Sequence, residues 1–333
     1  MIGGGAPVTV QSMTNTPTSD AHATIEQIRR LQVAGCDIVR VAVPDMEAAG
    51  AIRQIVSSCT IAVVADIHFD HKLALAALEA GVHKLRINPG NIDRVSEVAR
   101  AAGERGVPIR VGVNAGSIDR SRYGLPTAQS LVESALDEVR ALENRGFESI
   151  VISLKAFDVP MMIEAYRLAS KQCDYPLHLG VTEAGLAWEG TIRSSVGIGA
   201  LLAEGIGDTI RVSLTGDPVE EVHVGREILA ALGLWHKPFT LISCPTCGRC
   251  AVDLTGIAEE VRRRLEADPP ARPITVAVMG CVVNGPGEAS LADVGIAGGR
   301  GSGAIFARGK MLRKVSEDAL VDELMKEVER LQQ

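Results

Sequence analysis

Short runs rich in valine and isoleucine alternate with amphipathic helical stretches from Pro7 to about Leu234. This alternation is typical of parallel strands that are joined by crossover helices. The predicted strands are Val8–Ser12, Ile38–Val43, Ile61–Asp66, Lys84–Ile87, Ile109–Val113, Ser149–Leu154, Leu177–Val181 and Thr209–Leu214. Eight strand-helix units over about 230 residues have the size of a closed (β/α)8 TIM-type barrel, and an open doubly wound sheet is the alternative.

Glycines mark the ends of several predicted helices. The helical segments include Ala21–Ala34, Leu73–Glu79, Ser130–Asn144 and Val219–Leu232. A glycine after the last helical turn adopts a left-handed backbone at little cost because it has no Cβ. Such caps are predicted at Gly35, Gly81, Gly106, Gly146, Gly205 and Gly233.

The pattern changes after Trp235-His236-Lys237-Pro238. A strand, a helix and a second strand are predicted, followed by a glycine-rich stretch that we expect to be loop and by a charged C-terminal helix. Their approximate ranges are Phe239–Ser243, Gly256–Glu266, Ile274–Met279 and, for the last helix, Glu317–Leu331. We therefore predict two domains, the barrel at residues 1–236 and a smaller αβ domain at residues 237–333.

Composition excludes several classes of protein. With 46% hydrophobic and 23% charged residues, the chain of 333 residues has the profile of a globular protein with a substantial core. No apolar run approaches the roughly 18 residues that span a bilayer, and Met1-Ile2-Gly3 does not begin a signal peptide, so we expect a cytoplasmic protein without a membrane partner. The net charge of -7 argues against a nucleic-acid partner.

Polar residues lie at or just after the carboxyl end of nearly every predicted strand, and in a barrel these ends meet at one mouth, where active sites form. They are Arg40, Asp66, His68, Arg86, Asn88, Arg110, Asn114, Lys155, His178, Glu183, Arg211 and Ser213. Five of them are cations, which are costly to bury without a counterion, so they predict an anionic ligand such as a diphosphate. The alternative is that they are ordinary surface residues that pair with nearby carboxylates.

Glu183 follows the seventh predicted strand. A partly desolvated carboxyl group at this position can act as an acid near neutral pH. A loop salt bridge is the alternative for this residue.

The seven cysteines predict a metal centre. An odd number of cysteines in a chain without a secretion signal argues against a disulfide framework. Four of them lie in the last third of the chain, as two overlapping C-x-x-C spacings in Cys244-Pro245-Thr246-Cys247-Gly248-Arg249-Cys250 and as Cys281. Thiolates at this spacing bind zinc or an iron-sulfur cluster, and the spacing leaves open whether Cys250 is a fourth ligand.

Longer motifs resemble the hydroxymethylbutenyl diphosphate synthase family, in its bacterial form, from Ile2 to about Gly309. Beside the cysteine motifs they are Val10-Gln11-Ser12-Met13-Thr14-Asn15-Thr16, Asp37-Ile38-Val39-Arg40-Val41-Ala42-Val43-Pro44, Leu85-Arg86-Ile87-Asn88-Pro89-Gly90-Asn91 and Arg110-Val111-Gly112-Val113-Asn114-Ala115-Gly116-Ser117. The resemblance implies a barrel followed by a domain similar to the cluster-binding part of sulfite and nitrite reductases. It also implies reductive ring opening and dehydration of 2-C-methyl-D-erythritol 2,4-cyclodiphosphate to 4-hydroxy-3-methylbut-2-enyl diphosphate, in non-mevalonate isoprenoid biosynthesis.

The resemblance further implies a ligand set and a cofactor. The family's 4Fe-4S ligands fall on Cys244, Cys247, Cys281 and Glu288, with the glutamate as an exchangeable catalytic ligand. Cys250 is then not a ligand. The family's substrate contacts fall on Arg40, Arg86, Asn88, Arg110, Asn114, Lys155, Arg211 and Ser213, with Asp66, His68 and His178 nearby, and its proton donor falls on Glu183.

Partners also follow from the resemblance. The implied working unit is a head-to-tail homodimer, in which the small domain caps the barrel of the other subunit. No large insertion separates the two domains, so reduced flavodoxin is the expected electron donor, with ferredoxin as the alternative. Family members usually carry a further stretch before Ile2, and we expect the shortened N-terminus to reduce stability.

Two other readings of the residues remain. One is a phosphate-handling barrel aldolase or synthase that carries a structural zinc ribbon. The other is a non-catalytic iron-sulfur electron-transfer module, which would have no need for five cations at the strand ends.

Overall fold

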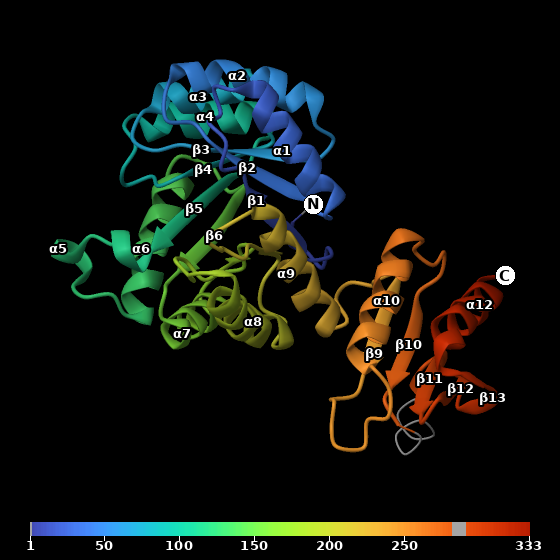
Figure 1. The fold of residues 1–333 in the computed structure, drawn as a ribbon. Coiled ribbons are helices and arrows are strands. Elements are labelled where there is room, and N and C mark those ends of the chain that lie inside the picture. The colour runs from blue at the N-terminus through green and yellow to red at the C-terminus, as the bar shows by residue number, and fades with distance from the viewer. Residues whose placement is uncertain (1, 282–290) are drawn as a thin grey trace. The chain divides into compact units, whose positions relative to one another are not determined.

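The computed structural model describes residues 2–281 and 291–333. The chain divides into two compact units, Met1–Trp235 and His236–Gln333, which are described separately here (Figure 1). Within the described residues no helix is both long and apolar enough to cross a membrane.

The first unit is a barrel of parallel strands. Its strands are β1 (Thr9–Met13), β2 (Ile38–Ala42), β3 (Ala62–Asp66), β4 (Lys84–Ile87), β5 (Ile109–Asn114), β6 (Ile150–Lys155), β7 (His178–Leu179) and β8 (Thr209–Ile210). They pair in the order β6-β5-β4-β3-β2-β1-β8-β7. A parallel bridge between Ile152 and Leu177 joins the two end strands. The predicted (β/α)8 barrel is therefore confirmed, and the open sheet is excluded.

Helices surround these strands (Figure 1). They are α1 (Ala21–Val33), α2 (Met46–Ser58), α3 (His71–Glu79), α4 (Val95–Arg105), α5 (Arg120–Tyr123), α6 (Ala128–Glu143), α7 (Val159–Ala169), α8 (Ala187–Ala203) and α9 (Pro218–Ala231). All six glycines predicted to cap helices have a positive φ. At the other end, α1, α2, α3, α7 and α9 each begin after an aspartate whose side chain accepts a backbone N–H bond. These local signals explain why the helix positions could be predicted closely.

Two strands are much shorter than predicted. The ladders of β7 and β8 end at Leu179 and Ile210, whereas the sequence predicts strands to Val181 and Leu214. A Cβ on Gly180 would lie 2.6 Å from the carbonyl oxygen of Arg211, so the two segments approach more closely than side chains permit. The irregular backbone after β8 carries Arg211 and Ser213 to the barrel mouth.

The second unit is a five-stranded sheet in the order β13-β12-β11-β10-β9. Its strands are β9 (Phe239–Ser243), β10 (Ile274–Met279), β11 (Val294–Gly299), β12 (Ser302–Ala307) and β13 (Lys310–Ser316), and its helices are α10 (Leu254–Ala267) and α12 (Leu320–Gln332). Strands β9, β10 and β11 are parallel, β12 is antiparallel to β11, and β13 is antiparallel to β12. A core of its own includes Val261, Val276, Ile296 and Leu324.

The prediction of a loop before the C-terminal helix is wrong, because β11, β12 and β13 occupy most of it. Glycine is common there for a packing reason. A Cβ on Gly295 would lie 2.7 Å from the carbonyl oxygen of Ala277, and one on Gly303 would lie 2.7 Å from the side chain of Leu320. These glycines permit close contact within the sheet and with the covering helix, and they do not mark turns.

Candidate active site and cysteine centre

A cavity of about 200 Å³ lies at the carboxyl ends of the barrel strands. Its lining includes nine of the twelve predicted strand-end residues, namely Arg40, Asp66, His68, Arg86, Arg110, Asn114, Lys155, Arg211 and Ser213. Ser153 and Thr182 complete the wall. The alternation of side chains along each strand explains this convergence, because residues two apart on one strand face the same side.

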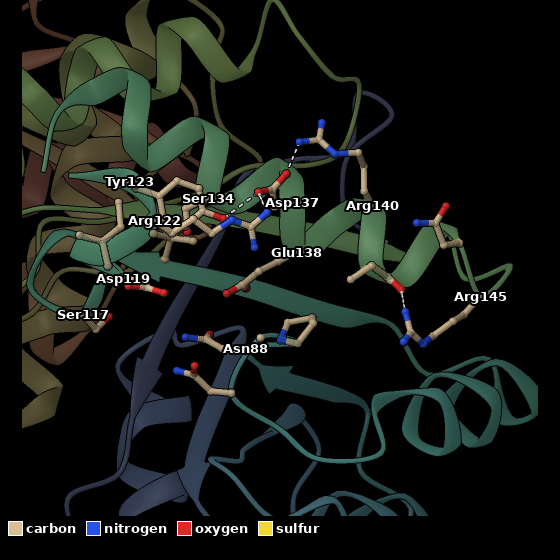
Figure 2. A pocket seen from close by; sticks show the side chains of 17 residues that line it. Asn88, Ser117, Asp119, Arg122, Tyr123, Ser134, Asp137, Glu138, Arg140 and Arg145 are labelled. Atoms are coloured by element: carbon tan, nitrogen blue, oxygen red, sulfur yellow. Dashed lines mark hydrogen bonds and ion pairs between the residues drawn. The ribbon is translucent and has the colours of Figure 1, made fainter. Parts of the chain in front are cut away.

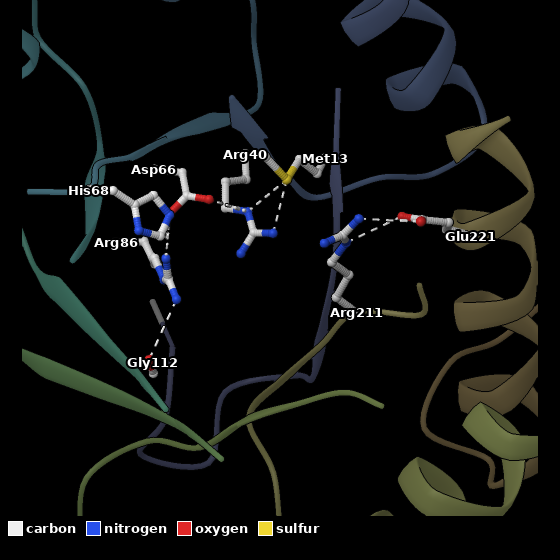
Figure 3. Close-up of polar contacts among 8 residues, drawn as sticks. All are labelled: Met13, Arg40, Asp66, His68, Arg86, Gly112, Arg211 and Glu221. Carbon is white, nitrogen blue, oxygen red and sulfur yellow. Dashed lines mark hydrogen bonds and ion pairs between the residues drawn. The ribbon is translucent and has the colours of Figure 1, made fainter. Parts of the chain in front are cut away.

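Asp66 holds two of the cations (Figure 3). Its carboxylate lies 3.1 Å from Arg86 Nη1 and 3.6 Å from Arg40 Nε. Burial by itself raises the pKa of Asp66, but Arg40 and Arg86 outweigh it and the net pKa lies below its ordinary value. His68 Nε2 lies 2.8 Å from Arg86 Nη1. Burial and the nearby arginines lower the pKa of His68, which favours a neutral ring that accepts this bond.

Glu221 holds a third cation on another side of the cavity (Figure 3). This carboxylate, from the first turn of α9, accepts hydrogen bonds from Arg211 Nε and Nη2, each at 3.3 Å. The contact was not predicted from the sequence. Glu221 follows another acidic residue in the first turn of a helix. Carboxylates are common at this position because they interact favourably with the helix dipole, so the sequence gives no separate sign that Glu221 binds a cation.

Arg110 and Lys155 are buried without such support. Arg110 is 1% exposed, and its Nε and Nη1 atoms have no hydrogen-bond partner among the described residues. The charged neighbours that act most strongly on Lys155 are all arginines. Burial and these arginines lower the pKa of Lys155 well below its ordinary value. Buried donors without partners are costly, so an anion is the kind of ligand that suits this cavity.

Three predicted residues do not line this cavity. His178 is fully buried on β7, where its Nδ1 meets Thr209 Oγ1, and burial together with Arg110 and Lys155 lowers its pKa. Asn88 lines a neighbouring cavity. Glu183 is exposed, and its φ of 55° lies in the left-handed region that few non-glycine residues adopt.

The neighbouring cavity has a volume of about 490 Å³ and lies between the loop after β4 and helix α6 (Figure 2). The side chains of Asn88 and Glu138 point into it. Asn88 Oδ1 and Glu138 Oε2 are buried without a hydrogen-bond partner among the described residues. Burial raises the pKa of Glu138 to about 8. The arginines here are engaged, since Arg122 and Arg140 both pair with Asp137.

Sequence reasoning missed four residues at or beside the cavity, Met13, Ser153, Thr182 and Glu221. Ser153 had a usable signal, because it stands two residues before Lys155 on β6 and so faces the same side. Met13 contacts Arg40, with 3.1 Å from its sulfur to Arg40 Nε. Its apolar side chain gave no sign of this role.

The predicted cysteine centre lies at the carboxyl ends of two paired strands. Cys244 directly follows β9, and Cys281 follows β10 after Gly280. The register pairs Ser243 with Val278, and the backbone N–H of Gly280 donates to Cys244 Sγ at 3.3 Å. The chain therefore brings the starts of these two cysteine segments together.

The other predicted ligands differ in their surroundings. Cys247 is exposed, whereas Cys250 is partly buried and its thiol donates to the carbonyl oxygen of Val252 at 3.3 Å. A Cβ on Gly280 would lie 2.5 Å from Cys250 Sγ, so Cys250 packs directly on this glycine. Glu288 lies outside the described residues. Thiolates from loops at adjacent strand ends suit a soft metal centre, and the exposed Cys247 leaves its sulfur accessible to one.

Solved structures of known proteins share the barrel. Dihydropteroate synthase from Stenotrophomonas maltophilia matches with a TM-score of 0.52 at 16% identity, over 69% of this chain and 92% of that one. The enzyme from Coxiella burnetii matches with a TM-score of 0.52 at 12% identity, over 69% and 93%. At this identity the likeness concerns the fold alone.

Sequence comparisons are more specific. The model of the GcpE TIM-barrel domain matches residues 1–226, and that of the GcpE protein C-terminal domain matches residues 240–330. Two relatives named 4-hydroxy-3-methylbut-2-en-1-yl diphosphate synthase (flavodoxin) come from Geobacter sulfurreducens and Clostridium acetobutylicum. They are 60% and 58% identical, each over 99% of this chain, and the matches cover 95% and 96% of those proteins. The resemblance drawn from the motifs is confirmed, and the chain belongs to the GcpE family.

Proposed function

We propose that this protein catalyses the two-electron reductive ring opening and dehydration of 2-C-methyl-D-erythritol 2,4-cyclodiphosphate to 4-hydroxy-3-methylbut-2-enyl diphosphate. The names of its relatives support the product. The structural observation that carries the proposal is the pair of buried cations, Arg110 and Lys155, which face a cavity without a carboxylate partner of their own. A diphosphate supplies the missing acceptors.

Binding of the diphosphate is assigned to the cations of the cavity. Arg40, Arg86 and Arg211 are oriented by carboxylates, whereas Arg110 retains two unused donors and the strongest charged neighbours of Lys155 are all arginines. Asn114 and Ser213 add neutral hydrogen-bonding groups at the same wall. Asp66 and His68 act by orienting Arg40 and Arg86, and His178 lies behind the wall as a neutral ring. Asn88 is the predicted contact that this arrangement supports least.

Proton delivery is assigned to Glu183. The reaction breaks a carbon–oxygen bond to the diphosphate, releases one water and consumes two electrons, and the departing hydroxyl needs a proton. Glu183 stands in the loop after β7 with a left-handed backbone. Strained backbone of this kind is concentrated at functional sites. Its exposure in the barrel leaves the carboxyl group accessible to a ligand.

The second unit is assigned to a 4Fe-4S cluster with the ligands Cys244, Cys247, Cys281 and Glu288. When bound, the cluster supplies the electrons, and a carboxylate ligand on an otherwise thiolate centre is the one most readily displaced. The adjoining ends of β9 and β10 support the placement of Cys244 and Cys281 in one centre. Cys250, packed on Gly280, supports the loop and ligates no metal.

The partners follow the same proposal. Reduced flavodoxin is the electron donor, as the names of the relatives suggest, and ferredoxin is the alternative. A head-to-tail homodimer, in which the small unit of one subunit covers the barrel of the other, is the proposed working assembly. The test of this point is the molecular mass in solution, which should be twice the 35.1 kDa of the chain.

The experiment that tests the function follows the phosphorus resonances of the cyclic diphosphate by NMR. Anaerobically reconstituted protein with reduced flavodoxin should convert them to those of a linear diphosphate ester. The Arg110→Met variant should bind the substrate about 100-fold more weakly, since it removes charge-assisted bonds to the diphosphate. Conversion by protein that contains no iron would contradict the proposal.

A further inference from the structure

Glu221 receives four hydrogen bonds inside the barrel unit. Besides Arg211 Nε and Nη2, its carboxylate accepts from Ser12 Oγ at 3.0 Å and from the backbone N–H of Leu214 at 3.1 Å. The residue is 4% exposed. One carboxylate thus ties together β1, the irregular segment after β8 and the start of α9. Both Arg211 and Ser213, which belong to that segment, line the cavity.

Arg211 needs such an anchor because its other charged neighbours repel it. The charge of Arg211 interacts unfavourably with the positive charges of Arg40, Arg110 and Lys155. A long, flexible guanidinium among like charges would turn toward solvent in the absence of a counterion. Glu221 lies on the side of Arg211 that faces away from Arg40 (Figure 3). Its two bonds to the guanidinium hold Arg211 beside the other cations before any anion has bound.

We propose that Glu221 is a positioning residue for the diphosphate, which holds Arg211 and the segment Arg211–Leu214 in the geometry that binds the anion. The inference rests on the proposed function and adds a residue that does not line the cavity. Asp66 holds Arg40 and Arg86 in the same way, through ion pairs. The five cations are therefore of two kinds, three held by carboxylates and two left for the ligand.

The test compares Glu221→Gln with Glu220→Gln. Glutamine keeps the shape of the side chain and removes the charge that holds Arg211. Glu220 is the preceding residue of the same helix, is exposed, and pairs only with His223 among the described residues. We expect Glu221→Gln to bind inorganic pyrophosphate about 10- to 100-fold more weakly and to raise KM for the cyclic diphosphate more than it lowers kcat. The Glu220→Gln protein should bind like the unmodified protein.

A double-mutant cycle separates positioning from general stabilisation. If Glu221 acts through Arg211, adding Glu221→Gln to Arg211→Gln should weaken pyrophosphate binding less than twofold further. Full additivity, or wild-type affinity in Glu221→Gln, would overturn the inference. If Glu221→Gln does not fold, Glu221→Asp tests the same point, since the shorter carboxylate should reach Arg211 poorly and give an intermediate loss. Absence of cyclic diphosphate turnover in the unmodified protein would instead contradict the proposed function.

Discussion

Burial sets the protonation of Lys155 at the barrel mouth. Its pKa lies well below the ordinary value because of burial and the surrounding arginines, and a bound anion would raise it again. Anion binding should therefore take up a proton, and affinity should fall as pH rises above the pKa of the free protein. Sulfate, which does not titrate in this range, is the suitable probe.

Calorimetry in buffers of different ionisation enthalpy measures this uptake. We expect the heat of sulfate binding to depend on the buffer for the unmodified protein and to lose most of that dependence in Lys155→Met. Equal heats in all buffers would show that Lys155 is already charged in the empty cavity.

Glu138 links stability to pH at the neighbouring cavity. Its folded-state pKa of about 8 exceeds the ordinary 4.5, so between these values the folded protein holds a proton that the unfolded chain has released. The free energy of unfolding should therefore fall as pH rises through this window. Glu138→Gln removes the ionisation and should be more stable at pH 8 by up to about 4 kcal/mol, with little difference near pH 4.

Urea unfolding at both pH values checks this expectation. Glu133→Gln is the control, because Glu133 is exposed on the same helix and bonds only to Gln129 among the described residues. A gain in stability of the same size at pH 4 and pH 8 would rule out ionisation as its cause.

A substitution of Glu183 can distinguish an effect on the chemical step from an effect on substrate binding. If it delivers a proton, Glu183→Gln should lower kcat by about 100-fold and change KM little, because glutamine keeps the size of the side chain and cannot donate an acidic proton. Steady-state kinetics with the cyclic diphosphate measure both constants. Unchanged kcat would remove Glu183 from proton transfer.

At the scale of elements, local signals were sufficient for most of the barrel and insufficient for the second sheet. Valine-rich strands, aspartate N-caps and glycine C-caps are all local patterns, and the structure follows them. Strands β11 and β12 were missed because their glycines serve contacts with residues far away in the sequence, such as Gly303 with Leu320. The role of Glu221 was missed for the same reason, since Ser12 is 209 residues away.

Gly280, directly after strand β10, packs against the loop that contains Cys250. Because a Cβ there would lie 2.5 Å from Cys250 Sγ, Gly280→Ala should displace the loop that carries Cys244 and Cys247. We expect less iron per chain after anaerobic reconstitution, with the barrel unchanged. Iron analysis and pyrophosphate affinity measure the two effects. Gly248→Ala is the control in the same loop, since nothing lies within 4 Å of its added Cβ; equal iron content in both variants would show that the contact is unimportant.

At the scale of the whole molecule, each unit supplies only some of the groups that the proposed reaction needs. The barrel contains a cavity lined by five cations, and the second unit contains thiols at two strand ends. Family motifs predicted both parts from the sequence. The alternation of side chains along the strands predicted nine residues that line one cavity. It could not show that Asn88 lines the neighbouring cavity instead, because the direction of this side chain depends on the loop after β4.

The electron balance of a single turnover tests the central claim most directly. Protein purified without oxygen and reduced by a one-electron donor would be mixed with the cyclic diphosphate, and electrons consumed would be counted against product formed. We predict brown protein with about four irons per chain and two electrons consumed for each linear diphosphate. Colourless, zinc-loaded protein that consumes no electrons would contradict it and would favour a phosphate-handling barrel with a structural metal ribbon.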